Sequence, residues 1–97
     1  MGATRDLTAE MIQVYEGSTV NRADRQTLVG DGLGGMASQW VVDARADLLT
    51  AVNVVRSEQN LPDANIAEIL LLEIDACGSF DYVERLAGGC ARLALGV

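Results

Sequence analysis

Residues 36–58, MASQWVVDARADLLTAVNVVRSE, decide the fold of this chain. Apolar residues recur there every three or four positions, which places them on one face of a helix. The residues of this stripe are Met36, Trp40, Ala44, Leu48, Ala51, Val52 and Val55. Further apolar residues widen the surface beyond one face, whereas Arg45 and Arg56 lie away from the stripe. The segment predicts a helix roughly 35 Å long, which is either the centre of a bundle or an oligomer interface.

If this helix forms an interface, the chain is a homodimer that pairs through the stripe. The expected interface residues are then Met36, Trp40, Leu48, Val52 and Val55. A hydrophobic fraction of 49% is high for 97 residues, and self-association or a bound partner would cover the surplus.

The segments that precede the long helix are shorter. Residues 5–16 predict a first helix that ends at Gly17, and residues 21–28 predict a second, weaker one. The apolar positions on one face of the first helix are Leu7, Met11, Val14 and Tyr15. Residues 30–35, GDGLGG, carry too many glycines for a stable helix. We expect a flexible hinge there, and a ligand loop is the alternative that the sequence leaves open.

A phosphate loop is disfavoured at this glycine-rich segment. Successive backbone amides can cradle an anion. However, no Gly-Lys-Ser/Thr ending follows the glycines, and Asp31 would repel a phosphate.

Two further helices are expected after the long one. Leu61-Pro62-Asp63 marks a boundary, with Asp63 as the N-cap of a helix that ends at Gly78. Its expected inner face comprises Ile66, Ile69, Leu70, Ile74 and Cys77. Ser79 is expected to cap the last helix, in which Gly88-Gly89 permits a kink or a close helix approach. The residues expected to face inward there are Phe80, Val83, Leu86, Ala87, Cys90 and Ala94.

The whole chain is therefore expected to fold as one all-α domain, residues 1–97, a compact bundle of four to five helices with a long central helix at about 36–58. No segment alternates with the period of two that a strand requires over more than a few residues. Residues 12–14 and 40–42 are the only short candidates for strands, and we expect none.

The distribution of charge points to binding rather than to chemistry. The chain has no histidine and no lysine, and seven arginines stand against fourteen acidic residues, for a net charge of −7. No basic residue lies between Arg56 and Arg85. The acidic residues of this stretch, which we expect to form a partner-binding surface, are Glu58, Asp63, Glu68, Glu73, Asp75, Asp81 and Glu84. A pI near 4.2 disfavours direct binding to nucleic acid or to an anionic membrane.

We expect no catalytic residue, cofactor or metal. Without histidine, Cys77 and Cys90 lack a general base and an ordinary zinc partner, so they are expected to be small buried hydrophobes. The carboxylates at 73, 75, 81 and 84 are expected on the solvent side of their helices, where no shift of pKa would fit them for acid–base work. Four aspartates could be proposed as cation ligands, but they lack the spacing of a calcium loop. They are Asp24, Asp31, Asp43 and Asp47.

Leu49-Thr50-Ala51-Val52 resembles the start of the second helix in acyl and peptidyl carrier proteins, which are small, acidic and helical. In that family the segment follows an Asp-Ser pair whose serine carries phosphopantetheine. Here Asp47-Leu48 stands at that place, so the attachment hydroxyl is absent and no carrier function is expected.

The expected function is that of a non-enzymatic, acidic interaction module. Its carboxylates would bind and inhibit or regulate a basic protein, for example a nucleic-acid-binding protein, in the place of phosphates. Small inhibitors made by bacteriophages offer a functional analogy. The alternative is a homo-oligomer that binds a small or hydrophobic ligand between subunits, near Tyr15, Met36 and Trp40. No signal peptide or membrane span is expected, and the location is expected to be cytoplasmic.

Overall fold

The computed structural model describes residues 5–97, which contain four α-helices, a short 3-10 helix and a two-stranded hairpin. The elements are α1 (Leu7–Ser18), η1 (Arg22–Arg25), β1 (Leu28–Gly30), β2 (Met36–Ser38), α2 (Gln39–Glu58), α3 (Ile66–Ala76) and α4 (Tyr82–Leu95). The expected all-α architecture with a long central helix is confirmed. Within residues 5–97, none of the helices has the length and apolar character that a membrane span requires.

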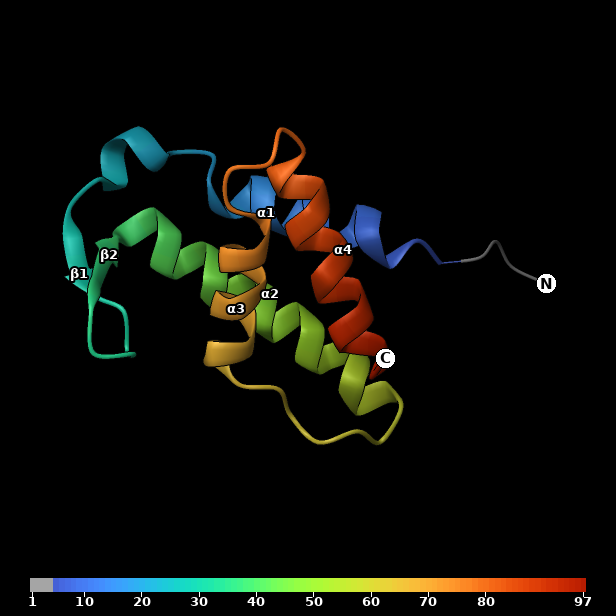
Figure 1. Cartoon of the computed structure of the whole chain (residues 1–97). Coiled ribbons are helices and arrows are strands. Elements are labelled where there is room, and N and C mark those ends of the chain that lie inside the picture. Colours follow the sequence, from blue (N-terminus) through green and yellow to red (C-terminus); the bar gives the residue numbers. More distant parts are fainter. Residues whose placement is uncertain (1–4) are drawn as a thin grey trace.

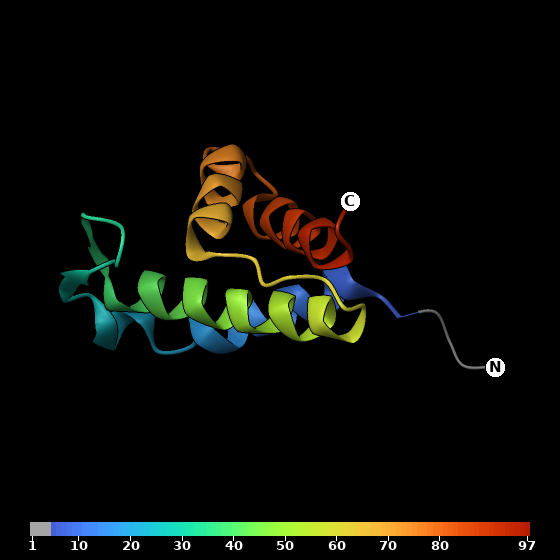
Figure 2. The ribbon, with the colours of Figure 1, turned by 90° about the horizontal axis from the view of Figure 1, so that it is seen from below.

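The longest helix, α2, is the spine of the molecule. Figure 1 and Figure 2 show α1 alongside α2, and α3 and α4 together over another side of it. These neighbours cover the apolar stripe that the sequence places on α2, and Leu48 and Val52 are wholly buried in the core of the chain itself. The core residues of α2 are Ala44, Leu48, Val52 and Val55. The stripe is thus the centre of the bundle.

The expectation that this stripe forms a dimer interface needs correction at three positions. Leu48, Val52 and Val55 are buried by the helices of their own chain, so no surface is left there for a second copy. Met36 is exposed and Trp40 is half-buried, with the guanidinium of Arg22 5.1 Å from the Trp40 ring centroid.

A β-hairpin replaces the hinge expected before α2. Val29 pairs with Ala37, and Gly30 with Met36, in an antiparallel register. The turn at residues 31–35 is held by Asp31, whose carboxylate accepts from the backbone N–H of Leu33 at 2.8 Å and of Gly35 at 3.0 Å. Strands of three residues leave no period for sequence reasoning to detect. Because residues 36–38 belong to β2, helix α2 begins at residue 39, not at residue 36.

The first helix has the expected buried face but different ends. Asp6 is its N-cap and accepts from the N–H of Ala9, while Leu7, Met11 and Tyr15 pack in the core. The helix continues past Gly17 to Ser18, whose hydroxyl donates to Asp47 at 2.6 Å. The expected helix over residues 21–28 is only the four-residue η1, followed by β1.

Helix α3 begins later than expected and buries less of its apolar face. Asn65, not Asp63, caps it, and Asn65 and Glu68 form a reciprocal capping box. Only Ile69 and Ala76 are buried, whereas Ile74 is 61% exposed and Cys77 is exposed. Helix α3 packs against α2 and α4, and the apolar side chains that do not face these two helices stay exposed.

Helix α4 packs as expected from Leu86 onward. Its buried residues include Leu86, Ala87, Cys90 and Ala94. Phe80 does not face inward, because it precedes the helix and its side chain is fully exposed. Gly89 serves close approach rather than a kink: a Cβ at this position would lie 2.6 Å from Cδ2 of Leu72 on α3.

Candidate functional site

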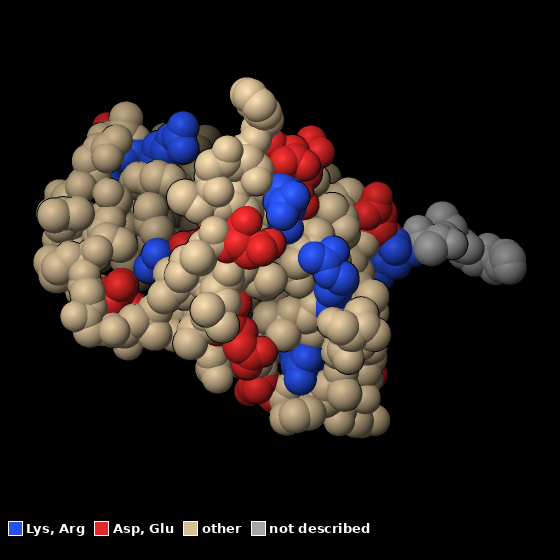
Figure 3. Space-filling model, viewed as in Figure 1, with Lys and Arg blue, Asp and Glu red and all other residues tan. Residues whose placement is uncertain are grey.

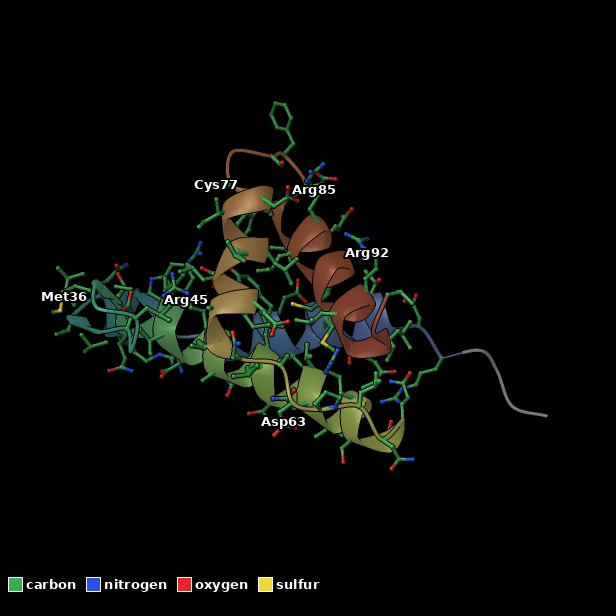
Figure 4. The ribbon with its side chains drawn as sticks, turned by 60° about the horizontal axis from the view of Figure 1, so that its bottom comes forward. Met36, Arg45, Asp63, Cys77, Arg85 and Arg92 are labelled. Atoms are coloured by element: carbon green, nitrogen blue, oxygen red, sulfur yellow. The ribbon has the colours of Figure 1, made fainter. Side chains whose placement is uncertain are left out.

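Polar side chains from four elements meet beside α2. Arg45 on α2 donates through Nε to both carboxylate oxygens of Glu73 on α3, at 2.8 and 2.9 Å. Asp31, in the hairpin turn, places Oδ2 4.0 Å from Arg45 Nη1. Tyr82, at the start of α4, borders the same place, and Figure 4 shows Arg45 between the hairpin and α3. We call Asp31, Arg45, Glu73 and Tyr82 the Arg45 cluster.

The position of Arg45 follows from the register of α2. It lies three residues before Leu48 and seven before Val52, so it belongs to the buried side of the helix. Its side chain is largely shielded from water there, and Arg45 is only 8% exposed. Glu73 provides the opposite charge that such burial requires. The expectation that Arg45 lies away from the stripe and Glu73 on the solvent side was wrong.

A hollow of about 270 Å³ opens onto this cluster. Leu70 and Ile74 form apolar walls, and Cys77 lies at its edge. Arg45 Nη1 is buried and has no hydrogen-bond partner within residues 5–97; its ion-pair partner, Oδ2 of Asp31, lies 4.0 Å away. Because the carboxylates of Asp31 and Glu73 already face Arg45, a neutral acceptor such as a carbonyl suits this place better than a second anion.

Burial governs the protonation of the groups around the cluster. It raises the pKa of the Glu73 carboxyl, and the Arg45 guanidinium opposes this shift only in part. Burial and the charge of Glu73 raise the pKa of Tyr82 to about 12, and the same two causes raise the pKa of the Cys90 thiol to about 12. Tyr15 stacks edge-on to Tyr82, with ring centroids 6.3 Å apart. At neutral pH, Tyr82 and Cys90 therefore keep their protons.

The seven acidic residues expected to form one binding surface do not lie together. Glu58 pairs with Arg5, Glu73 with Arg45, and Asp75 with Arg85 at 3.6 Å. Glu68 completes the capping box of α3. Figure 3 shows acidic and arginine side chains next to each other over α3 and α4, so this face is not uniformly negative. Arg85 and Arg92 on α4 supply positive charge to this face, whereas Arg5 pairs with Glu58 at the end of α2.

The remaining acidic residues divide between two ends of the molecule. Asp63 lies in the loop before α3, and Asp81 and Glu84 lie at the start of α4; Figure 4 places Asp63 and Cys77 at opposite ends of α3. The end at which α4 starts also carries Phe80, which is fully exposed, and Ile74. We call Ile74, Asp75, Phe80, Asp81 and Glu84 the α3–α4 corner. The corner thus holds a fully exposed aromatic residue and three acidic residues.

Three of the four aspartates considered as cation ligands make contacts within the fold, and Asp24 is exposed on η1. Asp43 accepts from Arg25 and from Gln39, and Asp47 accepts from Ser18. The turn amides of Leu33 and Gly35 lower the pKa of Asp31. In the part of the chain that the structure describes, no three His, Cys, Asp or Glu side chains gather in a way that could hold a metal ion.

Sequence reasoning missed Arg45 and Tyr82 as members of a site. A signal for Arg45 is present, because a charge in register with a buried stripe must be paired or lie at a functional position. Its partner on α3 could not be inferred, because 28 residues separate the two.

The chain matches no protein-family model, no curated protein and no solved structure.

Proposed function

We propose that this protein is a non-enzymatic interaction module that binds a basic protein through the α3–α4 corner. The observation that carries the proposal is the fully exposed side chain of Phe80 in the segment between α3 and α4, together with Ile74 on α3, which is 61% exposed. Large apolar side chains that are left exposed favour an interaction site over a plain solvated surface.

The composition of the corner resembles the anatomy of protein interfaces. An aromatic residue supplies the apolar area at the centre of an interface, and charged groups form its rim. Asp75, Asp81 and Glu84 provide that rim, and only Arg85 at 3.6 Å from Asp75 offsets their charge within the described chain. Their field attracts a partner that is rich in lysine or arginine and speeds its association.

The hollow at the Arg45 cluster adjoins this corner through Ile74, which lines both. An apolar side chain of the partner enters the hollow beside Leu70 and Ile74. The partner class that fits is a nucleic-acid-binding protein whose basic groove meets the carboxylates in the place of phosphates. Occupation of that groove inhibits or regulates the partner.

A comparison of two double variants tests the proposal. Asp81→Asn with Glu84→Gln neutralises two carboxylates of the corner, and Asn is still a good helix N-cap at position 81. Glu16→Gln with Asp24→Asn removes the same charge from exposed positions on α1 and η1. After gentle purification from the native cell, we expect the first variant to lose the basic partner and the second to retain it. Equal retention by both would refute the role of the corner.

A small apolar ligand is the second candidate, favoured by one observation. A hollow of about 790 Å³ lies between the start of α1 and the last turns of α4. Leu7, Val55 and Leu95 line it, and Gly88 leaves space there. Gly88→Phe would fill this hollow. If 8-anilinonaphthalene sulfonate binds the wild type and Gly88→Phe equally, the hollow is not a ligand site.

A further inference from the structure

A second hydrophobic surface lies between α3 and α4, next to the corner. A groove of about 280 Å³ has Leu71 and Leu72 on its α3 side and Leu93 and Val97 on its α4 side. Leu71 is 65% exposed and Val97 is 86% exposed, although both are apolar. Gly89 makes the floor of the groove, since its lack of a Cβ lets the two helices touch. The groove is therefore an apolar strip open to solvent.

The two walls of the groove carry opposite charges. Glu68 stands on the α3 wall and Arg92 on the α4 wall. Within residues 5–97 neither side chain forms an ion pair, because the ion pairs of this part of the chain join other arginines to other acidic residues. Figure 3 shows the acidic side chains over α3 next to the arginines over α4. The apolar strip is thus bordered by a negative wall and a positive wall.

A surface of this kind is complementary to itself. A two-fold axis that runs along the groove, in the plane of contact, places the strip of one copy on the strip of the other. The same rotation brings Glu68 of each copy opposite Arg92 of the other, so both charge pairs form at once. Arg92 would repel a partner that is basic throughout, whereas a second copy presents the complementary charge to both walls.

We infer that a second copy of this chain occupies the α3–α4 groove and that the protein is a two-fold symmetric dimer through this face. An interface of standard size covers about 800 Å² of each partner, which is roughly one seventh of the 5864 Å² surface of this chain. The contact therefore extends from the groove over the exposed side chains of Leu71 and Val97. Phe80, Asp81 and Glu84 do not line the groove, whereas Ile74 and Asp75 of the corner follow Leu71 by three and four residues on α3 and border the contact.

Sedimentation velocity over a range of protein concentrations tests this inference with a charge swap. Arg92→Glu places Glu68 opposite a second carboxylate at both symmetric contacts, and Glu68→Arg does the same with arginines. We expect each single variant to raise the dimer dissociation constant about tenfold. The double variant restores both pairs with their signs exchanged, and we expect it to return within about threefold of the wild type.

Matched variants keep the result unambiguous. Arg22→Glu reverses an exposed charge on η1, away from the groove, and should leave the dissociation constant unchanged. Leu71→Asp tests the apolar strip without touching the capping box that Glu68 supports, and should give a monomer with an unchanged helical spectrum. A wild type that is monomeric throughout, or a dimer that Arg92→Glu and Leu71→Asp leave intact, would overturn the inference.

Discussion

Nε of Arg45 donates to both carboxylate oxygens of Glu73, at 2.8 and 2.9 Å, and this ion pair joins α2 to α3 inside the molecule. The two side chains are only 10% and 13% exposed. Loss of one partner from a buried pair is costly because it leaves an uncompensated charge in a place that is largely shielded from water. The pair therefore fixes α3, and with it both surfaces proposed to bind.

Glu73→Ala should lower the free energy of unfolding by about 3 kcal/mol, as measured by urea denaturation. Arg45→Met combined with Glu73→Leu removes both charges and should cost less than the single substitution. Asp75→Ala is the control, because its pair with Arg85 is exposed and should contribute less than about 1 kcal/mol. Equal losses for Glu73→Ala and Asp75→Ala would show that the Arg45–Glu73 pair does not hold α3.

Tyr82 should make the fold sensitive to alkali. Burial and the charge of Glu73 raise its pKa to about 12 in the folded chain, above the value of about 10 for an unfolded tyrosine. The neutral phenol is therefore favoured by folding, and this stabilisation is present below pH about 10 and is lost as the pH rises from about 10 to about 12. Tyr82→Phe cannot ionise, so we expect it to unfold at higher pH than the wild type.

Phenolate absorbance and circular dichroism, followed together, check this expectation. In the wild type, phenolate should appear along with the loss of helical signal. Complete ionisation of both tyrosines near pH 10 in a chain that stays helical would contradict the buried environment of Tyr82.

The two thiols should differ in reactivity. Cys77 is exposed after the end of α3, whereas Cys90 is buried and has a pKa raised to about 12 by burial and by Glu73. Because the thiolate is the reactive form, Cys77 should react quickly with Ellman's reagent and Cys90 only after unfolding. Cys77→Ser should abolish the fast phase, and Cys90→Ala should leave it intact. A fast phase of two thiols in native wild type would place Cys90 at the surface.

Neighbouring glycines on α4 should respond to alanine in opposite directions. At Gly88 a Cβ has space, with only Arg92 Nη1 at 3.7 Å, so alanine should stabilise the helix by about 0.5–1 kcal/mol. At Gly89 a Cβ would lie 2.6 Å from Leu72 Cδ2, so the Leu72 side chain must leave its position between α3 and α4, and alanine should destabilise the fold by about 1 kcal/mol. Thermal unfolding of the two variants tests this prediction. A higher melting temperature for both variants would mean that the Leu72 side chain moves aside at no cost in stability.

The sequence supports the helical frame because α2 and α4 carry long, regular apolar stripes. It misses the hairpin because strands of three residues have no detectable period. Their apolar character predicts that Ile74 and Phe80 face inward. In the structure both are exposed, because α3 buries only the apolar side chains that face α2 and α4, and Phe80 precedes α4. Their exposure is what suggests a binding surface.

For the charges, too, the sequence predicts local features but not contacts between residues that are far apart in the chain. Their numbers are readable from the sequence, but their pairing is not. Arg5 reaches Glu58 across 53 positions, and Arg45 reaches Glu73 across 28. The negative stretch of the sequence is therefore divided by arginines in space, and three carboxylates of the α3–α4 corner remain as the site proposed to bind a basic protein.

Native mass spectrometry of the wild-type chain, purified gently from its own cell at low and at high salt, tests the central proposal most directly. We predict a complex with a basic protein at low salt that dissociates as salt rises, because exposed charge pairs are screened. A chain that is found at low salt only by itself, as monomer or dimer, would contradict the proposal that the α3–α4 corner binds a basic partner.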